Sequence, residues 1–196
     1  MNSRSKLMVS IACVVVLFVG VGQADATVIL NVSEVGADVV ATGSGSLDIS
    51  ALSYSFTFGP FAQMFPQVNG SLIVGPAGSS PNSDVYTGIS GPTAFGVGPG
   101  GLASLGAGTQ HFGIGGNLGQ VFVPQGYTSG SALNGSSTWS GQSFASLGIT
   151  PGTYVWTWGS GGNADSITLN AVPEPSTALL LATGLAALGA RRRREP

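Results

Sequence analysis

Short β-prone runs, broken every few residues by Gly, Ser, Pro and Asn, fill the chain between residues 27 and 171. No segment in this range repeats apolar residues at helical spacing, and residues 143–148 offer at most one helical turn. Strands and turns at such close spacing predict an all-β fold, either an antiparallel β-sandwich or a jelly-roll-like domain with Gly/Ser-rich loops. We expect strands at 27–33, 38–42, 47–49, 53–58, 71–74, 84–87, 111–114, 120–123, 152–158 and 165–170.

Positive charge is confined to the two ends of the chain. No Lys or Arg lies between Leu7 and Ala190, and charged residues make up 7% of the sequence against about 25% in ordinary soluble domains. Because nucleic-acid binding needs Lys or Arg to displace phosphate counterions, a nucleic-acid partner is excluded for residues 27–171. Electrostatic binding of this region to anionic membranes is excluded for the same reason. Its acidic residues are Glu34, Asp38, Asp48, Asp84 and Asp165.

The first part of the chain, residues 1–26, has the organisation of a secretory signal peptide with a signal helix. A short basic segment precedes an apolar run at 7–21, which has the length of a signal core and is short for a spanning helix. Ala24 and Ala26 supply small residues at positions −3 and −1, so we expect cleavage after Ala26. The only cysteine, Cys13, would leave with this segment. An uncleaved anchor is the alternative.

The last part of the chain, residues 172–196, falls into three segments. Two prolines exclude a helix from 172–177, and the apolar residues at 178–190 predict a single short transmembrane helix. The Arg-rich end at 191–196 is expected in the cytoplasm by the positive-inside rule, with the β domain across the membrane. The residues that define this tail are Pro173, Glu174, Pro175, Arg191, Arg192, Arg193 and Arg194.

Pro-Glu-Pro, a short apolar helix and a terminal Arg cluster, paired with a signal peptide, resemble the PEP-CTERM sorting signal. In that family the tail is recognised by exosortase, a membrane-embedded cysteine protease, with processing near the Pro-Glu-Pro, and the hosts are typically Gram-negative bacteria that make exopolysaccharide. The resemblance implies exosortase as a partner and a transient stay in the inner membrane. The destination would then be the cell surface, the extracellular matrix or the medium. An ordinary tail anchor is the alternative.

Aromatic residues are the first candidates for contact with a sugar polymer. Tyr154, Trp156 and Trp158 share one face of their expected strand. An exposed row of this kind would be a platform for sugar rings, but aromatics on one face of a sandwich strand are more often core, and we favour core here. Trp139 and Tyr127 lie among polar residues and are the better candidates for exposed aromatics.

Catalytic and metal-binding patterns are sparse. His111 is the only histidine, so a Ser-His-Asp site would have to use it, and no Gly-x-Ser-x-Gly elbow accompanies it. A carboxylate pair for glycoside cleavage could be drawn from the five acidic residues, but their spacing favours no pair. Residues 161–165 resemble a calcium loop faintly, yet one carboxylate is too few and a hairpin turn is favoured. No cofactor or metal site is expected.

Three hypotheses for function follow. The first is an exported, non-catalytic protein of the surface or extracellular matrix, which acts as a structural or carbohydrate-contacting component of exopolysaccharide. The second is a secreted hydrolase acting on polysaccharide or ester substrates, with a site around His111 or a carboxylate pair. The third is self-assembly, because flat strands without Lys residues are prone to pair edge to edge.

Overall fold

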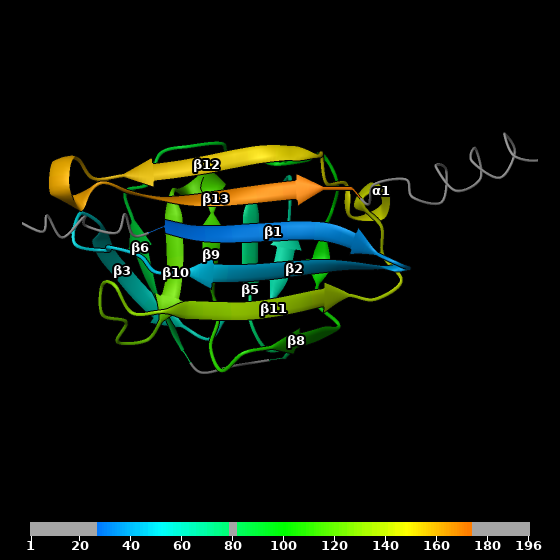
Figure 1. The fold of residues 1–196 in the computed structure, drawn as a ribbon, viewed down its shortest axis with the longest axis horizontal. Helices are drawn as coiled ribbons and strands as arrows, with labels where there is room; N and C mark the ends of the chain where they lie inside the picture. Colours follow the sequence, from blue (N-terminus) through cyan, green and yellow to red (C-terminus); the bar gives the residue numbers. More distant parts are fainter. Residues whose placement is uncertain (1–26, 79–81, 174–196) are drawn as a thin grey trace, which may run out of the picture.

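Two β-sheets packed face to face make up the protein, whose computed structural model describes residues 27–78 and 82–173. The strands of one sheet run across those of the other, so the sandwich is of the crossed rather than the aligned kind (Figure 1). Both sheets are largely antiparallel, as expected for an all-β sandwich. The prediction of an antiparallel β-sandwich is confirmed.

The first sheet has six strands in the order β12-β13-β1-β2-β11-β8. Two neighbouring strands of this sheet, β1 and β13, run parallel, with Thr27 opposite Ser166 and Ser33 opposite Val172. The strand that begins the described fold therefore lies beside the strand that ends it. The bounds are β1 Thr27–Val35, β2 Asp38–Gly45, β8 Leu105–Ala107, β11 Leu133–Trp139, β12 Gly152–Trp158 and β13 Asp165–Val172.

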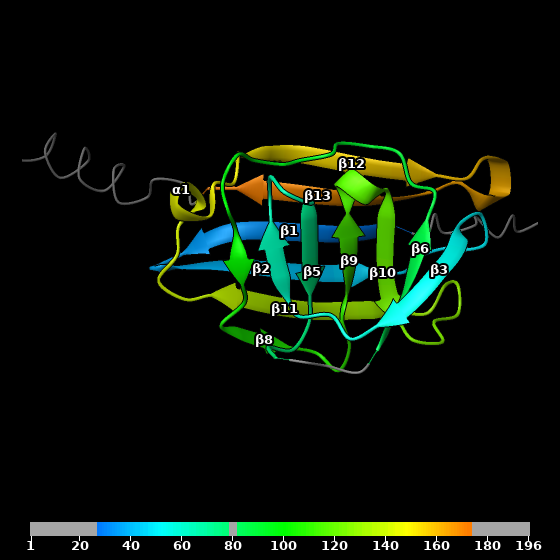
Figure 2. The ribbon, with the colours of Figure 1, turned by 180° about the vertical axis from the view of Figure 1, so that it is seen from behind.

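The second sheet has seven strands in the order β3-β6-β10-β9-β5-β4-β7, and β3 and β7 form its edges. Figure 2 shows it from the side opposite to Figure 1, with β3 running obliquely at one edge. The bounds are β3 Ser53–Phe58, β4 Gln63–Phe65, β5 Ser71–Val74, β6 Ser83–Thr87, β7 Gly101–Leu102, β9 Phe112–Gly115 and β10 Gln120–Pro124.

The core lies between the sheets and follows from alternation along the strands. β1 buries Val28, Leu30 and Val32 and turns the residues between them outward, since successive side chains point to opposite faces. Leu72 and Ile114 of the second sheet belong to the same buried cluster. A smaller cluster of Ile73, Val85 and Phe122 lies apart from it. Because Ile73 alternates with Leu72 along β5, this cluster occupies the outer face of the second sheet.

One expected strand, 47–49, is not a strand. The backbone N–H of Leu47 donates to the Tyr127 hydroxyl, that of Asp48 to the Asp165 carboxylate and that of Ile49 to the Ser129 hydroxyl. These three donors are satisfied by side chains, so no neighbouring strand is needed to pair with them. β11, which the sequence pattern did not predict, instead fills the sheet beside β2.

The remaining expectations concern a helical turn, the glycine-dense stretch and the helices at the two ends of the chain. A single helical turn, α1 Phe144–Leu147, forms as expected, with Ser143 as its cap. The glycine-dense stretch from 88 to 119 contains both loops and short strands, and a Cβ atom at Gly96 would lie 2.0 Å from the carbonyl oxygen of Gly148. No helix within the described residues is long and apolar enough to span a membrane. The signal helix at 1–26 and the helix expected at 178–190 lie outside those residues.

Candidate functional site

The aromatic row of β12 is part of the core. Trp156 is fully buried and Trp158 nearly so, while Tyr154 is half-buried against the main cluster. Each indole N–H has a carbonyl partner, Pro92 for Trp156 and Asp48 for Trp158, both at 2.7 Å. The preference for core over a sugar-binding platform is confirmed.

The prediction for Trp139 is wrong. Its side chain is 1% exposed and donates an N–H bond of 3.0 Å to the Gly101 carbonyl. Its polar sequence neighbours misled the interpretation, because Trp139 lies on the same inner face of β11 as Leu133 and Ser137.

Tyr127, the other candidate for an exposed aromatic, is half-buried against the main core cluster. Its hydroxyl donates to the Ser131 carbonyl at 2.6 Å and accepts from the Leu47 N–H at 2.9 Å. Tyr127 therefore joins the loop after β10 to the segment that follows β2.

The acidic residues serve as acceptors for backbone N–H groups. Glu34 accepts from Phe144 at 2.6 Å, at the start of α1, and Asp38 accepts from Gly141 at 2.8 Å. These two carboxylates therefore hold the loop after β11 against the β1–β2 hairpin. Because residues 27–173 contain no Lys or Arg, these carboxylates accept hydrogen bonds from backbone N–H groups instead of forming ion pairs.

Asp48 and Asp165, two of the five acidic residues, meet through a backbone hydrogen bond. The N–H of Asp48 donates to the carboxylate of Asp165 at 2.6 Å. The carboxylate of Asp48 accepts from the N–H of Ser50, and this bonding with Ser50 lowers the pKa of Asp48. Both carboxylates therefore accept hydrogen bonds from backbone N–H groups.

The Asp84 carboxylate also joins segments that are distant in the sequence. It accepts from the Gly126 N–H at 2.8 Å and from the hydroxyl of Thr57 on β3. It therefore joins an edge strand to the loop after β10.

Residues 161–165 form the expected hairpin turn. Gly161–Asn163 is a short 3-10 turn, and Trp158 pairs with Asp165 across the hairpin of β12 and β13. Within residues 27–78 and 82–173, no three His, Cys, Asp or Glu side chains gather in a way that could hold a metal ion.

His111 is buried between the end of β5 and the start of β9. Its Nε2 lies 2.7 Å from the carbonyl oxygen of Pro76, which can only accept, so Nε2 carries the proton and donates. Burial lowers the pKa of His111 and outweighs the opposing effect of that bond. The nitrogen that a Ser-His-Asp base would use is therefore bonded to the backbone.

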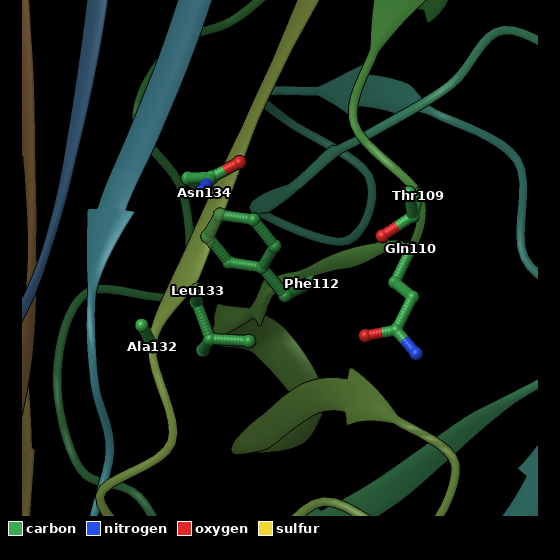
Figure 3. A pocket seen from close by; sticks show the side chains of 6 residues that line it. All are labelled: Thr109, Gln110, Phe112, Ala132, Leu133 and Asn134. Atoms are coloured by element: carbon green, nitrogen blue, oxygen red, sulfur yellow. The ribbon is translucent and has the colours of Figure 1, made fainter.

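Two adjoining hollows form a shallow groove between the loop before β9 and the loop that joins β10 to β11. The smaller has a volume of about 80 Å³ and the larger about 200 Å³, and both are lined by Gln110, Ala132 and Leu133. In Figure 3 the ring of Phe112 lies between Gln110 on one side and Leu133 on the other. Either volume is below the roughly 300–1,000 Å³ of most small-molecule pockets.

Uncharged polar side chains surround this groove. Those of Thr109, Gln110, Gln125, Thr128 and Asn134 are exposed, and none has a hydrogen-bond partner among the described residues. Tyr127 supplies an aromatic ring to the larger hollow. Amides and hydroxyls without partners, beside one ring, can bind an uncharged polyhydroxyl ligand. The sequence analysis missed every residue of this groove except Tyr127.

A second feature that the sequence analysis missed is the β3 aromatic pair, Phe56 and Phe58, whose side chains are 45% and 37% exposed. A β-bulge between Tyr54 and Phe56 shifts the pairing with β6. Tyr54 consequently contacts Tyr86, whereas Phe58 contacts Phe122 of the outer cluster. The strand expected at 53–58 is present as β3, whereas the bulge and the exposure of Phe56 and Phe58 were not predicted.

The residues of the sorting tail begin where the fold ends. Val172 closes β13, and the exposed Pro173 follows it directly. Glu174, Pro175 and the four arginines at 191–194 lie outside the described residues, as do Ala24 and Ala26 of the expected signal cleavage site.

Comparisons with known proteins bear on this tail. No curated protein and no solved structure matches the chain. Residues 171–194 match the model of the PEP-CTERM protein-sorting motif, so the match begins within β13 and covers the Pro-Glu-Pro and the Arg cluster. The chain therefore carries a PEP-CTERM sorting motif at residues 171–194, which supports export through the membrane, processing by exosortase and localisation at the cell surface.

Proposed function

We propose that this protein is a non-catalytic component of the cell surface or extracellular matrix that binds uncharged exopolysaccharide in the groove beside Tyr127. The observation that carries the proposal is the division of its polar groups. All five carboxylates between residues 27 and 173 accept backbone N–H bonds. Five polar side chains around the groove instead have no hydrogen-bond partner among the described residues: Thr109, Gln110, Gln125, Thr128 and Asn134.

Charge supports an uncharged ligand. Without Lys or Arg in residues 27–173, the domain cannot pair with the carboxylates or sulfates of an acidic polymer, and its own carboxylates would repel them. A neutral glycan needs only hydroxyl–amide hydrogen bonds and contact with a ring, and the groove offers both.

The non-catalytic part of the proposal rests on His111 and the acidic residues. His111 is directed into the backbone at Pro76, and the Asp48–Asp165 contact is made through a backbone N–H. These groups form hydrogen bonds that stabilise the fold. Replacing His111 by Ala should therefore leave polysaccharide binding intact. A hydrolase that depends on His111 would lose its activity with the same change.

The experiment is affinity electrophoresis of the purified protein in gels that contain dextran, galactomannan or, as an acidic comparison, alginate. We expect retardation by at least one neutral polymer and none by alginate. Replacing Gln110 and Asn134 together by Ala should weaken retardation about five- to hundredfold, since each lost hydrogen bond is worth about 0.5–1.5 kcal/mol. Asn163→Ala is the matched control, because Asn163 is exposed on the β12–β13 turn and does not line the groove.

Two results would count against the proposal. Equal retardation of the wild type and the double variant would show that the groove is not the binding site. Retardation by none of the neutral polymers would show that the ligand is not a neutral polysaccharide of this kind. Release of new reducing ends from any of these polymers during incubation would favour the hydrolase instead.

A further inference from the structure

Strand edges differ sharply in how well they are protected. At the β12 edge, Ser90 and Thr157 exchange two backbone hydrogen bonds of 2.9 Å. Gly96 bridges to Ile149, which precedes β12 in the chain. Residues 90–96 thus run along β12 and cover it (Figure 2). The edge strands β7 and β8 have only two and three residues. Short or covered edges are the usual protection against pairing with another chain.

β3 has neither kind of protection. It is six residues long and pairs on one side only, with β6. Beyond that ladder its backbone makes no backbone–backbone hydrogen bond to the described residues, and its Ser53 carbonyl accepts from the hydroxyl of Thr87, a residue of β6. It contains no charged residue and no proline, and the nearest proline, Pro60, follows its end. The bulge beside Ser55 interrupts the strand, which leaves Phe56, Thr57 and Phe58 as its regular part.

We propose that a second copy of this protein pairs with β3 through the same strand, antiparallel and about a two-fold axis centred on Thr57. In this register Phe56 of each copy lies opposite Phe58 of the other, on the outer face where Phe58 already contacts Phe122. Aromatic residues opposite each other across a strand pair are a favourable combination. The two sheets would become one continuous sheet through the dimer.

Charge and symmetry favour a second copy over an unrelated partner. An isologous contact needs a surface that complements itself, and an uncharged strand with an aromatic residue on each side of its centre meets that condition. The Asp84 carboxylate accepts hydrogen bonds from the Thr57 hydroxyl and the Gly126 N–H, which stabilise its charge within the protomer. Because the pairing uses the β3 edge of both copies, it closes at a dimer and does not continue into a fibre.

Area sets the strength. With about 200 Å² for a whole aromatic side chain, the exposed parts of Phe56 and Phe58 amount to roughly 160 Å² per copy. Even with the strand backbone and Tyr54 added, the total stays near or below the ~1,000 Å² of a stable specific interface. The dimer is therefore weak and concentration-dependent. It does not rest on the proposed polysaccharide groove, which lies on other segments.

Sedimentation equilibrium of the purified, exported protein over a wide concentration range tests this proposal. We expect a monomer–dimer equilibrium without larger species, and Phe56→Lys should weaken it at least tenfold. Val155→Lys is the control. Val155 is 42% exposed on the covered strand β12, and its substitution introduces the same charge as Phe56→Lys. A wild type that is monomeric at every concentration, or equal weakening by both variants, would overturn the proposal.

A cross-linking variant tests the register and keeps both phenylalanines in place. Thr57→Cys in a Cys13→Ser background puts two cysteines at the two-fold axis, where opposed Cα atoms about 4.5–5.5 Å apart lie within disulfide range. Mild oxidation should then give covalent dimers, whereas Val155→Cys should give few. Equal yields from both variants would contradict this register. If Phe56→Lys instead reduces retardation by dextran while the wild type stays monomeric, the β3 aromatic pair is a glycan contact and the dimer proposal fails.

Discussion

β12 and β3 look alike in the sequence and differ in the structure. Both alternate aromatic residues with small or polar ones, and both lie at the edge of a sheet. Yet Trp156 of β12 is fully buried, whereas Phe56 of β3 is 45% exposed. The difference in burial comes from the face on which each ring lies, because Trp156 faces the opposite sheet and Phe56 lies on the outer face with Val85. The edges of the two strands differ as well. Residues 90–96 cover the β12 edge, and no described segment bonds to the outer edge of β3.

The comparison shows that alternation identifies a strand with two unlike faces but does not say which face is covered. For β12, the inner face meets the opposite sheet and the Trp156 indole reaches the Pro92 carbonyl. For β3, a bulge places the rings on two different faces, so Tyr54 contacts Tyr86 and Phe58 contacts Phe122. Cover and bulge are both set by segments distant in sequence.

The largest effect should separate the two strands directly. Trp156→Ala removes a fully buried side chain and its hydrogen bond, so we expect a loss of about 3–5 kcal/mol in the free energy of unfolding. Phe56→Ala should lower the free energy of unfolding by less than about 1.5 kcal/mol, because the Phe56 side chain is already 45% exposed in the fold. Urea denaturation measures both, and equal losses would remove the contrast.

A smaller effect should appear when the cover over β12 is disturbed. A Cβ atom at Gly91 would lie 2.6 Å from Cδ1 of Trp156 and 2.7 Å from the carbonyl oxygen of Val155. Gly91→Ala should therefore push residues 90–96 away from β12, cost about 1–3 kcal/mol and shift tryptophan fluorescence to the red.

Gly162→Ala is the control for that change, because no atom lies within 4 Å of a Cβ at Gly162. It should leave stability and fluorescence nearly unchanged. If Gly91→Ala behaves in the same way, residues 90–96 do not protect the β12 edge, and the explanation for the difference between β12 and β3 fails.

Acidification should act on the covered interior more than on β3. Burial lowers the pKa of His111 in the fold below its unfolded value of about 6.5, so the unfolded chain binds more protons in that window. Stability is present above about pH 6.5 and decreases as the pH falls toward the folded pKa. Asp48, whose pKa Ser50 lowers, adds a further loss below about pH 4.

Thermal unfolding at a series of pH values measures this effect, and His111→Asn should remove the part near pH 6. The dimer should not follow the His111 transition, because the His111 ring bonds to the Pro76 carbonyl beyond β5, whereas β3 pairs with β6. A dimer that dissociates together with the His111 transition would show that β3 is coupled to the interior.

The sequence carried the fold class and the sorting tail, because both depend on local pattern. Period-two alternation and turn residues predicted the strands, and the Pro-Glu-Pro with its Arg cluster predicted the motif that matches residues 171–194. The burial of the β12 aromatics was also predicted, since one face of a sandwich strand is normally core.

The groove and the environment of Trp139 could not be predicted, because both arise from long-range contacts. Gln110 and Asn134 meet only after β9 and β11 have joined different sheets. Trp139 stands among polar residues in the sequence, yet its indole lies inside and donates to Gly101. The segment 47–49 resembled a strand, but its donors are satisfied by side chains about 80 or more residues away.

Intact mass of the native protein, measured separately in inner-membrane, matrix and culture-medium fractions, tests the central claim most directly. The account predicts a species in the matrix or medium that begins at Thr27, the first residue of β1, and ends between Pro173 and Pro175, just after β13. A chain that keeps its full C-terminus in the inner membrane would contradict it.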